Sequence, residues 1–389
     1  MTSQRGASAT DALRVTHIVF DFDGGGMESL VAEMAARFSG SSVHVSLITL
    51  SGRVGRLGGV TRDRFDQFHV LRPRSGASML WPRGVARAIR ATRADVVHLH
   101  SGCWYKGARA ARLAGVRRVI YTEHGREHDD PPFQQWLDRR AAAHTDVVVA
   151  VSQRLAGYLV EDVGIESRKV ITVHNGVNTS LFTPGPASSD LRATLNIPAE
   201  SFVIGSVGRL EPVKAYDRVL EAVAYVRDAL PRPFVVVLIG DGSERQALQE
   251  HAQRLGLADV VRLPGWMSNP VDAYRLLDVF VLPSRSEGQS VSLMEAMACG
   301  VAPLVTDVGA NGEMLGSEFR RLVVDANPGR VVDAIADALR TIATRELGSG
   351  TLRDEMRRRA VEHYSSQRMM TEYEQLYRAD GRTPPTVPL

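Results

Sequence analysis

The sequence predicts an α/β protein built from two doubly wound, Rossmann-like domains in tandem. At 389 residues the chain is too long for one ordinary doubly wound domain. Short β-branched apolar runs alternate with helical patterns, which is typical of a parallel sheet covered by helices on both faces. The alternation is interrupted once, by the Pro-, Gly- and Ser-rich segment LFTPGPASSD, and then starts again.

The first series of strands and helices predicts an N-terminal domain over residues 1–180. Its strands are near-continuous apolar runs, as expected of parallel strands that are buried on both faces. The predicted strands are Val15–Phe20, Val43–Leu50, Asp95–His100, Arg117–His124 and Asp146–Ser152, and the predicted helices include Glu28–Phe38, Trp81–Thr92 and Gln134–Ala143.

The second series predicts a C-terminal domain over residues 181–360. A charged helical segment, about Asp354–Arg378, has no strand after it. We therefore expect residues 361–389 to form a C-terminal helix that packs back on the N-terminal domain, followed by a loose tail. The predicted strands are FVIGSVGRL, FVVVLIG, VVRLPG, DVFVLPS, VAPLVT and RLVV, with helices at about Val213–Leu230, Glu244–Leu255, Asn269–Leu276 and Ser290–Cys299.

Composition narrows the class of protein. Hydrophobic residues make up 44% and charged residues 23% of the chain, as in soluble globular proteins. Cys103 and Cys299 are the only cysteines, which excludes a disulfide framework and fits a reducing compartment. The first residues contain no signal-peptide pattern, and no apolar run approaches the roughly 18 residues of a transmembrane helix. The expected location is the cytoplasm.

Charge is distributed unevenly along the chain. Through Gly176 there are 24 Lys/Arg against 17 Asp/Glu, whereas the remainder holds 23 against 27. Ten arginines lie between Gly52 and Arg93, with only Asp63 and Asp66 as acids. A solvated surface is the ordinary explanation, but such a surface also suits an anionic partner. We expect the Arg53–Arg93 region to make peripheral contact with the inner face of an anionic membrane. We expect no nucleic-acid partner.

Ligands of open α/β sheets bind beyond the carboxyl ends of the strands, so the loops there are the candidate sites. The first is DFDGGGMES, where Gly25 and Gly26 precede a helix whose free N–H groups suit an anion. A plain tight turn is the alternative. Asp21-Phe-Asp23-Gly also resembles the nucleophile motif of haloacid dehalogenase-type phosphatases, although Gly25 stands where that family has Thr or Val.

Two histidine-containing loops, HLHSG and TEHGREH, follow consecutive strands. A zinc site is one interpretation, but no Cys or acidic ligand completes a recognisable set around the histidines. Hydrogen bonding to sugar or phosphate by His100 and His124, at the strand ends, is favoured over zinc; purely structural histidines are the alternative. The histidines in question are His98, His100, His124 and His128.

The second domain contains two charged loops. In SVGRLEPVKAYDRVLEA, Arg209 and Lys214 could converge on a diphosphate and stabilise its departure. In SRSEGQSVSLMEAMACG, Glu287 and Glu295 could bind sugar or ribose hydroxyls, and the N–H groups near Gly288–Ser290 could meet phosphate or sugar oxygens. The alternative is that Glu295, which lies on this apolar helix, binds no ligand and only pairs with a neighbouring side chain, since a buried carboxylate needs partners.

From about Ile18 to Tyr377 the chain resembles the family 4 glycosyltransferases of the GT-B superfamily. The specific feature is the run from Glu287 to Glu295 with AMACG, joined to Arg209 and Lys214 upstream. The other matching pieces are GGGMESLV, VVHLHSG, TEHG, VVVAVSQRLAGYL, VHNGVNTSLF, LIGDGSER and VRLPGW.

The resemblance implies a GT-B fold with the active site in the cleft between the domains, and a retaining transferase. Such an enzyme moves a hexose-type sugar from a UDP- or GDP-linked donor to a hydroxyl of a glycan, lipid-linked or small-molecule acceptor, and uses neither metal nor cofactor. The implied catalytic residues are His124, Arg209, Lys214 and Glu287. The implied donor-binding residues are Gly25, Gly26, Arg209, Lys214, Glu287, Gly288, Gln289, Ser290 and Glu295, and the implied acceptor-binding residues are His100 and His124.

The sequence departs from the family at three places: Ala215 replaces a usual Gly, Gln289-Ser290 replaces aromatic-Gly, and Gly309-Ala310 replaces Gly-Gly. The change at Gln289-Ser290 falls where donor-sugar contacts are expected. A GT-B phosphorylase or nucleotide-sugar epimerase is the main alternative function. A glycoside hydrolase would use the two glutamates but would leave the cationic pair without a purpose, and a two-lobed sugar-binding protein usually carries an export signal.

Overall fold

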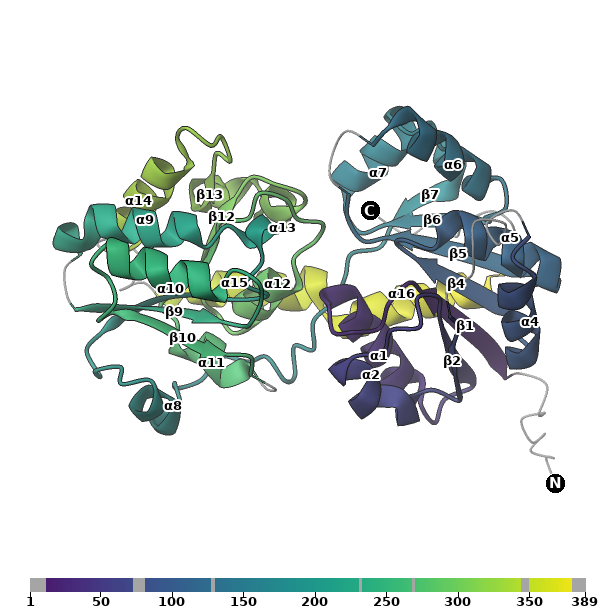
Figure 1. Ribbon diagram of the computed structural model, residues 1–389, viewed down its shortest axis with the longest axis horizontal. Helices are drawn as coiled ribbons and strands as arrows, with labels where there is room; N and C mark the ends of the chain where they lie inside the picture. Colours follow the sequence, from purple (N-terminus) through teal and green to yellow (C-terminus); the bar gives the residue numbers. More distant parts are fainter. Residues whose placement is uncertain are drawn as a thin grey trace, which may run out of the picture. The chain divides into compact units, whose positions relative to one another are not determined.

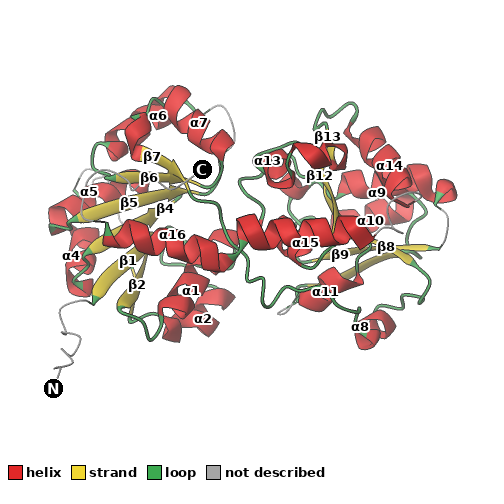
Figure 2. Ribbon diagram, turned by 180° about the vertical axis from the view of Figure 1, so that it is seen from behind, coloured by secondary structure: helices red, strands yellow, loops and turns green. Residues whose placement is uncertain are grey.

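The computed structural model describes residues 12–72, 81–126, 130–230, 233–267, 270–343 and 350–379. It divides the chain into two compact units. Unit 1 consists of Met1–Val173 with Met370–Leu389, and unit 2 of His174–Met369. Each unit has its own parallel sheet with helices on both faces (Figures 1 and 2). This is the GT-B architecture of two Rossmann-like α/β domains.

The sheet of unit 1 has seven parallel strands in the order β3-β2-β1-β4-β5-β6-β7. The order reverses direction between β1 and β4, so the carboxyl ends of these two central strands form the topological switch point. The strands are β1 (Leu13–Val19), β2 (Val43–Thr49), β3 (Gln67–Val70), β4 (Val96–His100), β5 (Arg118–Glu123), β6 (Val147–Ala150) and β7 (Val170–Thr172).

The two faces of this sheet differ in chemistry. One face presents Ile18, Leu99 and Tyr121, which join an apolar core with residues of α4 and α5. The other face presents buried histidines, which meet tyrosines of the C-terminal helix α16. The helices of unit 1 are α1 (Gly26–Phe38), α2 (Arg56–Thr61), α4 (Arg83–Thr92), α5 (Trp104–Ala114), α6 (Pro132–Ala142), α7 (Gln153–Glu161) and the Met370–Arg378 part of α16 (Ser366–Arg378).

The sheet of unit 2 has six parallel strands in the order β10-β9-β8-β11-β12-β13, so its switch point lies between β8 and β11. Its strands are β8 (Phe202–Val207), β9 (Phe234–Ile239), β10 (Val261–Gly265), β11 (Val279–Leu282), β12 (Ala302–Thr306) and β13 (Val323–Val324). Its helices are α8 (Ser189–Thr194), α9 (Asp217–Val226), α10 (Arg245–Arg254), α11 (Val271–Leu276), α12 (Val291–Ala298), α13 (Asn311–Leu315), α14 (Val331–Thr341) and α15 (Gly350–Tyr364). None of the described helices in either unit is long and apolar enough to cross a membrane.

The structure differs from the prediction in two edge strands, in the C-terminal helical segment and in the start of one helix. The edge strands β3 and β7 were not expected, because they are short and only partly buried and so lack a long apolar run. The C-terminal helical segment is broken between Tyr364 and Ser366. There Val177 donates its N–H to the Tyr364 carbonyl and accepts from the Ser366 N–H, so a backbone bridge replaces helical hydrogen bonds.

The predicted helix from Val213 begins later, at Asp217, and Lys214 lies in a preceding 3₁₀ turn, Pro212–Lys214. Ala215 closes this turn in the left-handed region, with φ 51° and ψ 44°. A Cβ in that region is crowded against the backbone, which is why glycine suits it better. The substitution of the family's usual glycine therefore stores strain beside Lys214.

Ala215→Gly is expected to stabilise the protein by about 0.5–1 kcal/mol, because relief of the left-handed alanine exceeds the added backbone entropy of glycine in the unfolded chain. Chemical denaturation should show a higher midpoint. Ala222→Gly, at a buried position in the ordinary helix α9, serves as a control and should destabilise. A lower midpoint for Ala215→Gly would contradict the proposed strain.

Candidate functional site

Two neighbouring loops of unit 2 bring Lys214, predicted to bind the diphosphate, into contact with Glu287, predicted to bind the sugar. One loop connects β8 to α9 and carries Arg209 and Lys214; the other connects β11 to α12 and carries Glu287. The Lys214 Nζ donates to Glu287 Oε1 at 2.7 Å, and the two side chains are only 17% and 8% exposed. Ser284 Oγ also donates to the same carboxylate oxygen at 2.6 Å. Arg209 is exposed at the end of β8.

This ion pair was not expected from the sequence, which assigned Lys214 to phosphate and Glu287 to sugar. The contact holds both side chains at the switch point of the sheet, where the carboxyl ends of β8 and β11 lie side by side. An ammonium has three donors, so Lys214 can keep Glu287 and still donate to a ligand oxygen. The pair therefore couples the cation predicted to bind phosphate to the carboxylate predicted to bind sugar hydroxyls.

Helix α12 (Val291–Ala298) begins shortly after Glu287 in the chain. Ser290 is its N-cap residue, and its Oγ accepts the N–H of Leu293. The loop before it is held by a bond from the Ala310 N–H to the Gly288 carbonyl. Gly309 has φ 53°, and a Cβ there would lie 2.1 Å from the Glu287 carbonyl oxygen. The close packing of the Gly309–Ala310 segment against the loop before α12 fixes the backbone at Gly288.

Glu295 lies on the second turn of α12 and has a buried partner. The Tyr274 OH donates to Glu295 Oε2 at 2.6 Å. Burial, and then the nearby Glu295 carboxylate, raise the pKa of Tyr274 well above its usual value, so the phenol stays protonated as a donor. Tyr274 thus orients the Glu295 carboxylate, and Glu295 as a residue is only partly buried.

Gln289, predicted to bind donor, is 5% exposed and bonds within unit 2. Its Oε1 accepts the Asn175 N–H at 2.6 Å, and its Nε2 lies 3.0 Å from His174 Nδ1. The side chain that replaces the family's aromatic residue thus ties the α12 loop to the VHNG segment.

In unit 1, Gly25 is the N-cap residue of α1 and Gly26 its first residue, directly after the β1 loop. Gly24 has φ 140°, a region open to glycine. Of the phosphatase-like pair, Asp23 is exposed. Its side chain fills the space beside Gly55, where an added Cβ would lie 1.4 Å from its Oδ1.

The two predicted histidines of unit 1 are joined directly to each other. His100 Nδ1 lies 2.9 Å from His124 Nε2, and His100 Nε2 lies 3.0 Å from Nδ1 of a third histidine, His17 on β1. His100 is 1% exposed, so both of its ring nitrogens are occupied inside the protein. Burial lowers the pKa of His17 to about 3 and of His124 to about 4, the latter against an opposing effect of Glu123. These imidazoles are neutral at pH 7.

His98 bonds to hydroxyl groups instead. Its Nδ1 lies 2.8 Å from the Tyr377 OH, and its Nε2 lies 2.7 Å from Thr122 Oγ1. Nitrogens of His17, His98 and His100 lie within 4.8 Å of one another, the spacing of a metal site. The hydrogen bonds already engage every nitrogen of these three rings except His17 Nε2. His128, also considered for zinc, lies outside the described residues.

A second network in unit 1 was missed by the sequence analysis. Arg126 donates to Glu123 at 2.7 Å and to Asp130 at 2.8 Å, and it also bonds Asp138. Glu123 and Asp138 are each 2% exposed. The sequence signal that could have indicated this network is the single arginine among several acidic residues in TEHGREHDD. The network anchors the turn that carries His124.

The turn is fixed at several points. Ser101 Oγ donates to Glu123 Oε1 at 2.6 Å and accepts the backbone N–H of His124 at 2.9 Å.

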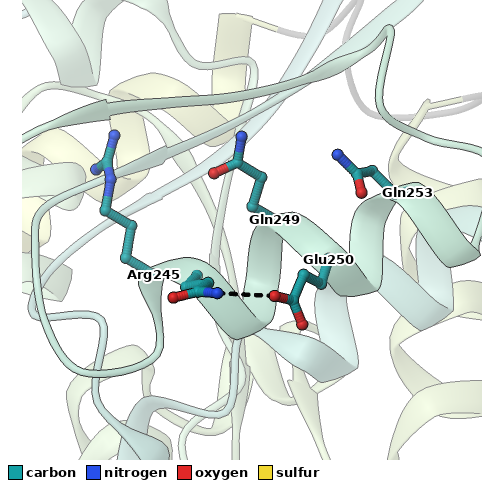
Figure 3. Close-up of a pocket in the computed structure, with 5 residues that line it drawn as sticks. Arg245, Gln249, Glu250 and Gln253 are labelled. Carbon is teal, nitrogen blue, oxygen red and sulfur yellow. Dashed lines mark hydrogen bonds between the residues drawn. The ribbon is translucent and has the colours of Figure 1, made fainter.

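A surface hollow along α10 of unit 2 involves none of the predicted site residues (Figure 3). It is lined by Arg245, Gln246, Gln249, Glu250 and Gln253, which project from one helix face.

Two family models match the chain. The model of Glycosyltransferase Family 4 matches residues 24–181, and the model of Glycosyl transferases group 1 matches residues 188–363. The chain is 31% identical over 382 residues to a D-inositol 3-phosphate glycosyltransferase of Kribbella flavida, covering 88% of this chain and 87% of the relative. It is 28% identical over 263 residues to the UDP-Gal:alpha-D-GlcNAc-diphosphoundecaprenol alpha-1,3-galactosyltransferase of Escherichia coli, covering 65% and 67%.

Solved structures agree in fold. A glycosyltransferase from Rickettsia africae superposes with a TM-score of 0.79 at 18% identity, covering 94% of this chain and 98% of that one. HepE of Anabaena in complex with UDP superposes with a TM-score of 0.78 at 18% identity, covering 94% and 99%.

Proposed function

This chain belongs to the family 4 glycosyltransferases, and we propose that it is a retaining hexosyltransferase that uses a UDP- or GDP-linked donor. The acceptor we propose is a hydroxyl of a glycan, a lipid-linked molecule or a small molecule. The Escherichia coli relative is named for a UDP-Gal donor and a diphosphoundecaprenol acceptor, and HepE has been solved with UDP, which supports a UDP-sugar as the first donor to test.

The observation that carries the proposal is the pairing of Lys214 with Glu287 at the switch point of unit 2, with Glu295 oriented on the next helix. We assign Arg209 and Lys214 to the diphosphate, Glu287 to donor-sugar hydroxyls and Glu295 to the ribose. Gly288, Gln289 and Ser290 complete the donor site in this proposal, Gln289 through its hold on the loop. In unit 1, we assign Gly25 and Gly26 to the donor diphosphate and His124 to the donor sugar.

The proposed step breaks the bond between the anomeric carbon and the phosphate oxygen and forms a bond from that carbon to the acceptor oxygen on the same face. The acceptor proton passes to the departing phosphate, and the cations stabilise the charge that grows on the diphosphate. In this proposal His124 contacts the acceptor and the donor sugar. His100 acts through its hydrogen bond to His124.

Turnover is expected to survive EDTA, because Arg209 and Lys214 supply the positive charge that a divalent ion would otherwise give to the diphosphate. Initial rates should be equal before and after chelation and gel filtration. Loss of turnover on chelation, restored by Mn²⁺ or Mg²⁺, would contradict metal independence.

We further propose that part of the Arg53–Arg93 region docks on anionic membrane. The structure splits this region between the faces of the sheet: α2 packs on α1, whereas α4 packs on α5. Residues 73–80 lie outside the described part. Helix α4 presents exposed Arg83, Arg87 and Arg90 and contains no acidic residue. Its outward face therefore carries the charge best suited to a lipid surface.

The double variant Arg83→Glu/Arg87→Glu is expected to abolish co-sedimentation with phosphatidylglycerol vesicles, because charge reversal replaces attraction by repulsion. Binding of the unaltered protein should weaken as salt rises. The control Arg168→Glu/Arg340→Glu changes the charge equally at exposed ion pairs elsewhere and should still bind. Equal binding to neutral and anionic vesicles would count against the docking surface.

A phosphorylase or an epimerase of the same fold would share the phosphate-binding cations. Product analysis separates them. Incubation with a nucleotide-sugar and an acceptor panel should release nucleoside diphosphate and give a glycoside with the anomeric configuration of the donor. A sugar phosphate formed from inorganic phosphate would indicate a phosphorylase, and a changed nucleotide-sugar without transfer would indicate an epimerase.

A further inference from the structure

Three imidazole rings of unit 1 form a single hydrogen-bonded chain. It runs from His17 on β1 through His100 at the end of β4 to His124 just after β5, with ring nitrogens 3.0 Å and 2.9 Å apart. Both end nitrogens, His17 Nε2 and His124 Nδ1, are buried and have no hydrogen-bond partner among the described residues. The ring planes at both links are nearly parallel, with interplanar angles of 13° and 26°.

The number of protons in this chain restricts its arrangement. A neutral imidazole carries one N–H and one bare nitrogen, and a hydrogen bond between two imidazoles needs one proton. Three neutral rings with two links therefore have only two arrangements. In the first, the remaining N–H is at His124 Nδ1 and His17 Nε2 is bare; in the second, the N–H is at His17 Nε2 and His124 Nδ1 is bare.

The inner end of the chain decides between the two. His17 is 0% exposed in the middle of β1, whereas His124 is only half-buried in the loop after β5, so an N–H on His124 can gain an acceptor from solvent or from a ligand and an N–H on His17 Nε2 cannot. A buried N–H without an acceptor costs more free energy than a buried bare nitrogen without a donor, and buried donors without partners are accordingly rare. The arrangement that leaves His17 Nε2 bare is favoured, and it places the N–H at the outer end.

We propose that His17 and His100 are positioning residues that fix His124 in the tautomer with a proton on Nδ1. His124 then donates a hydrogen bond to a substrate oxygen and does not serve as a base through this nitrogen. The substrate contact rests on the proposed function; the tautomer does not. Burial lowers the pKa of both end histidines far enough to keep the chain neutral at pH 7.

His98 provides a matched control because it lies beside this chain without belonging to it. Its ring centroid is 4.3 Å from that of His100, and it is 0% exposed. Its two nitrogens bond to hydroxyls of Tyr377 and Thr122, which can rotate to donate or accept. His98 therefore places no constraint on the proton of His124.

The test is the tautomer itself, read by long-range ¹H–¹⁵N correlation in full-length protein labelled with ¹⁵N-histidine, without substrate. Expected for the unaltered protein are a protonated Nδ1 and a bare Nε2 for His17, His100 and His124, with single-histidine substitutions giving the assignments. A protonated Nε2 on His124, or a His124 charged at pH 7, overturns the proposal whatever any variant does.

Two variants test whether the tautomer of His124 affects sugar transfer. His100→Phe cuts the chain and should let His124 populate its other tautomer, while kcat/KM falls about 10-fold, the scale for losing an outer hydrogen-bond partner. His98→Phe removes an equally buried ring and should leave the His124 tautomer unchanged. An unchanged tautomer in folded His100→Phe, or a change in His98→Phe, contradicts the proposal. Absent sugar transfer with the expected tautomer refutes the proposed function and leaves the tautomer assignment standing.

Discussion

Lys214→Ala is expected to lower kcat by about 10²–10³, the usual cost of losing one preorganised contact to a group that becomes charged in the transition state. The charge on the diphosphate grows as the glycosidic bond breaks, so the loss falls mainly on kcat and less on KM. Arg209→Ala should have a similar effect. The double variant should lose less than the sum of the two losses, because both cations act on one diphosphate.

The stability of these variants should differ. Arg209 is exposed, so its loss should leave unfolding unchanged, whereas Lys214→Ala leaves the buried carboxylate of Glu287 without its cation. Lys169→Ala is a control, since Lys169 bonds backbone carbonyls of unit 1 instead. Near-normal kcat/KM in folded Lys214→Ala and Arg209→Ala would refute the assignment of this site.

Arg126→Met is expected to destabilise the protein by about 3–5 kcal/mol, because it leaves buried carboxylates without a cation. Glu123 and Asp138 are both 2% exposed and both bond this guanidinium. Burial, against the opposing effect of Arg126, raises the pKa of Asp138, so this acid is already costly to ionise in the native protein. Urea denaturation at pH 7 measures the loss.

The destabilisation by Arg126→Met should shrink as the pH falls, because protonation removes the uncompensated charge. Arg168→Met is the matched control: Arg168 bonds Glu166 at 2.6 Å, but the two side chains are 78% and 58% exposed. This exposed pair should contribute no more than about 1 kcal/mol. Equal losses in the two variants would show that burial of the Arg126 network has no energetic consequence.

The sequence predicted the double parallel sheet well because buried parallel strands are long apolar runs. VTHIVF, DVVVAVS and FVVVLIG all became strands of the expected sheets. Loops after β8 and β11 could be named as site loops for the same reason, since the carboxyl ends of parallel strands mark ligand sites. Edge strands β3 and β7 lack this pattern, and the sequence gives no signal for them comparable to that of the central strands.

Side-chain pairings were beyond the sequence because they join residues far apart in the chain. Nothing in the sequence pairs Lys214 with Glu287, Glu295 with Tyr274, or His17 with His100. His17 interrupts an apolar strand, and a polar residue there signals a buried partner without identifying it. The proposed role of His124 as a donor follows only from the chain of rings, because no single histidine determines its own tautomer.

The most direct measurement of the central claim is thermal unfolding with a panel of UDP- and GDP-sugars in EDTA. A donor at about 100 times its dissociation constant should add about 2.7 kcal/mol to the stability. Glu295→Ala should reduce that gain, since its carboxylate is assigned to the ribose, and Gln249→Ala in the α10 hollow should retain it. A shift with at least one nucleotide-sugar, diminished by Glu295→Ala, is the predicted result. No shift with any UDP- or GDP-sugar, or an equal shift in Glu295→Ala, would contradict the donor site proposed in unit 2.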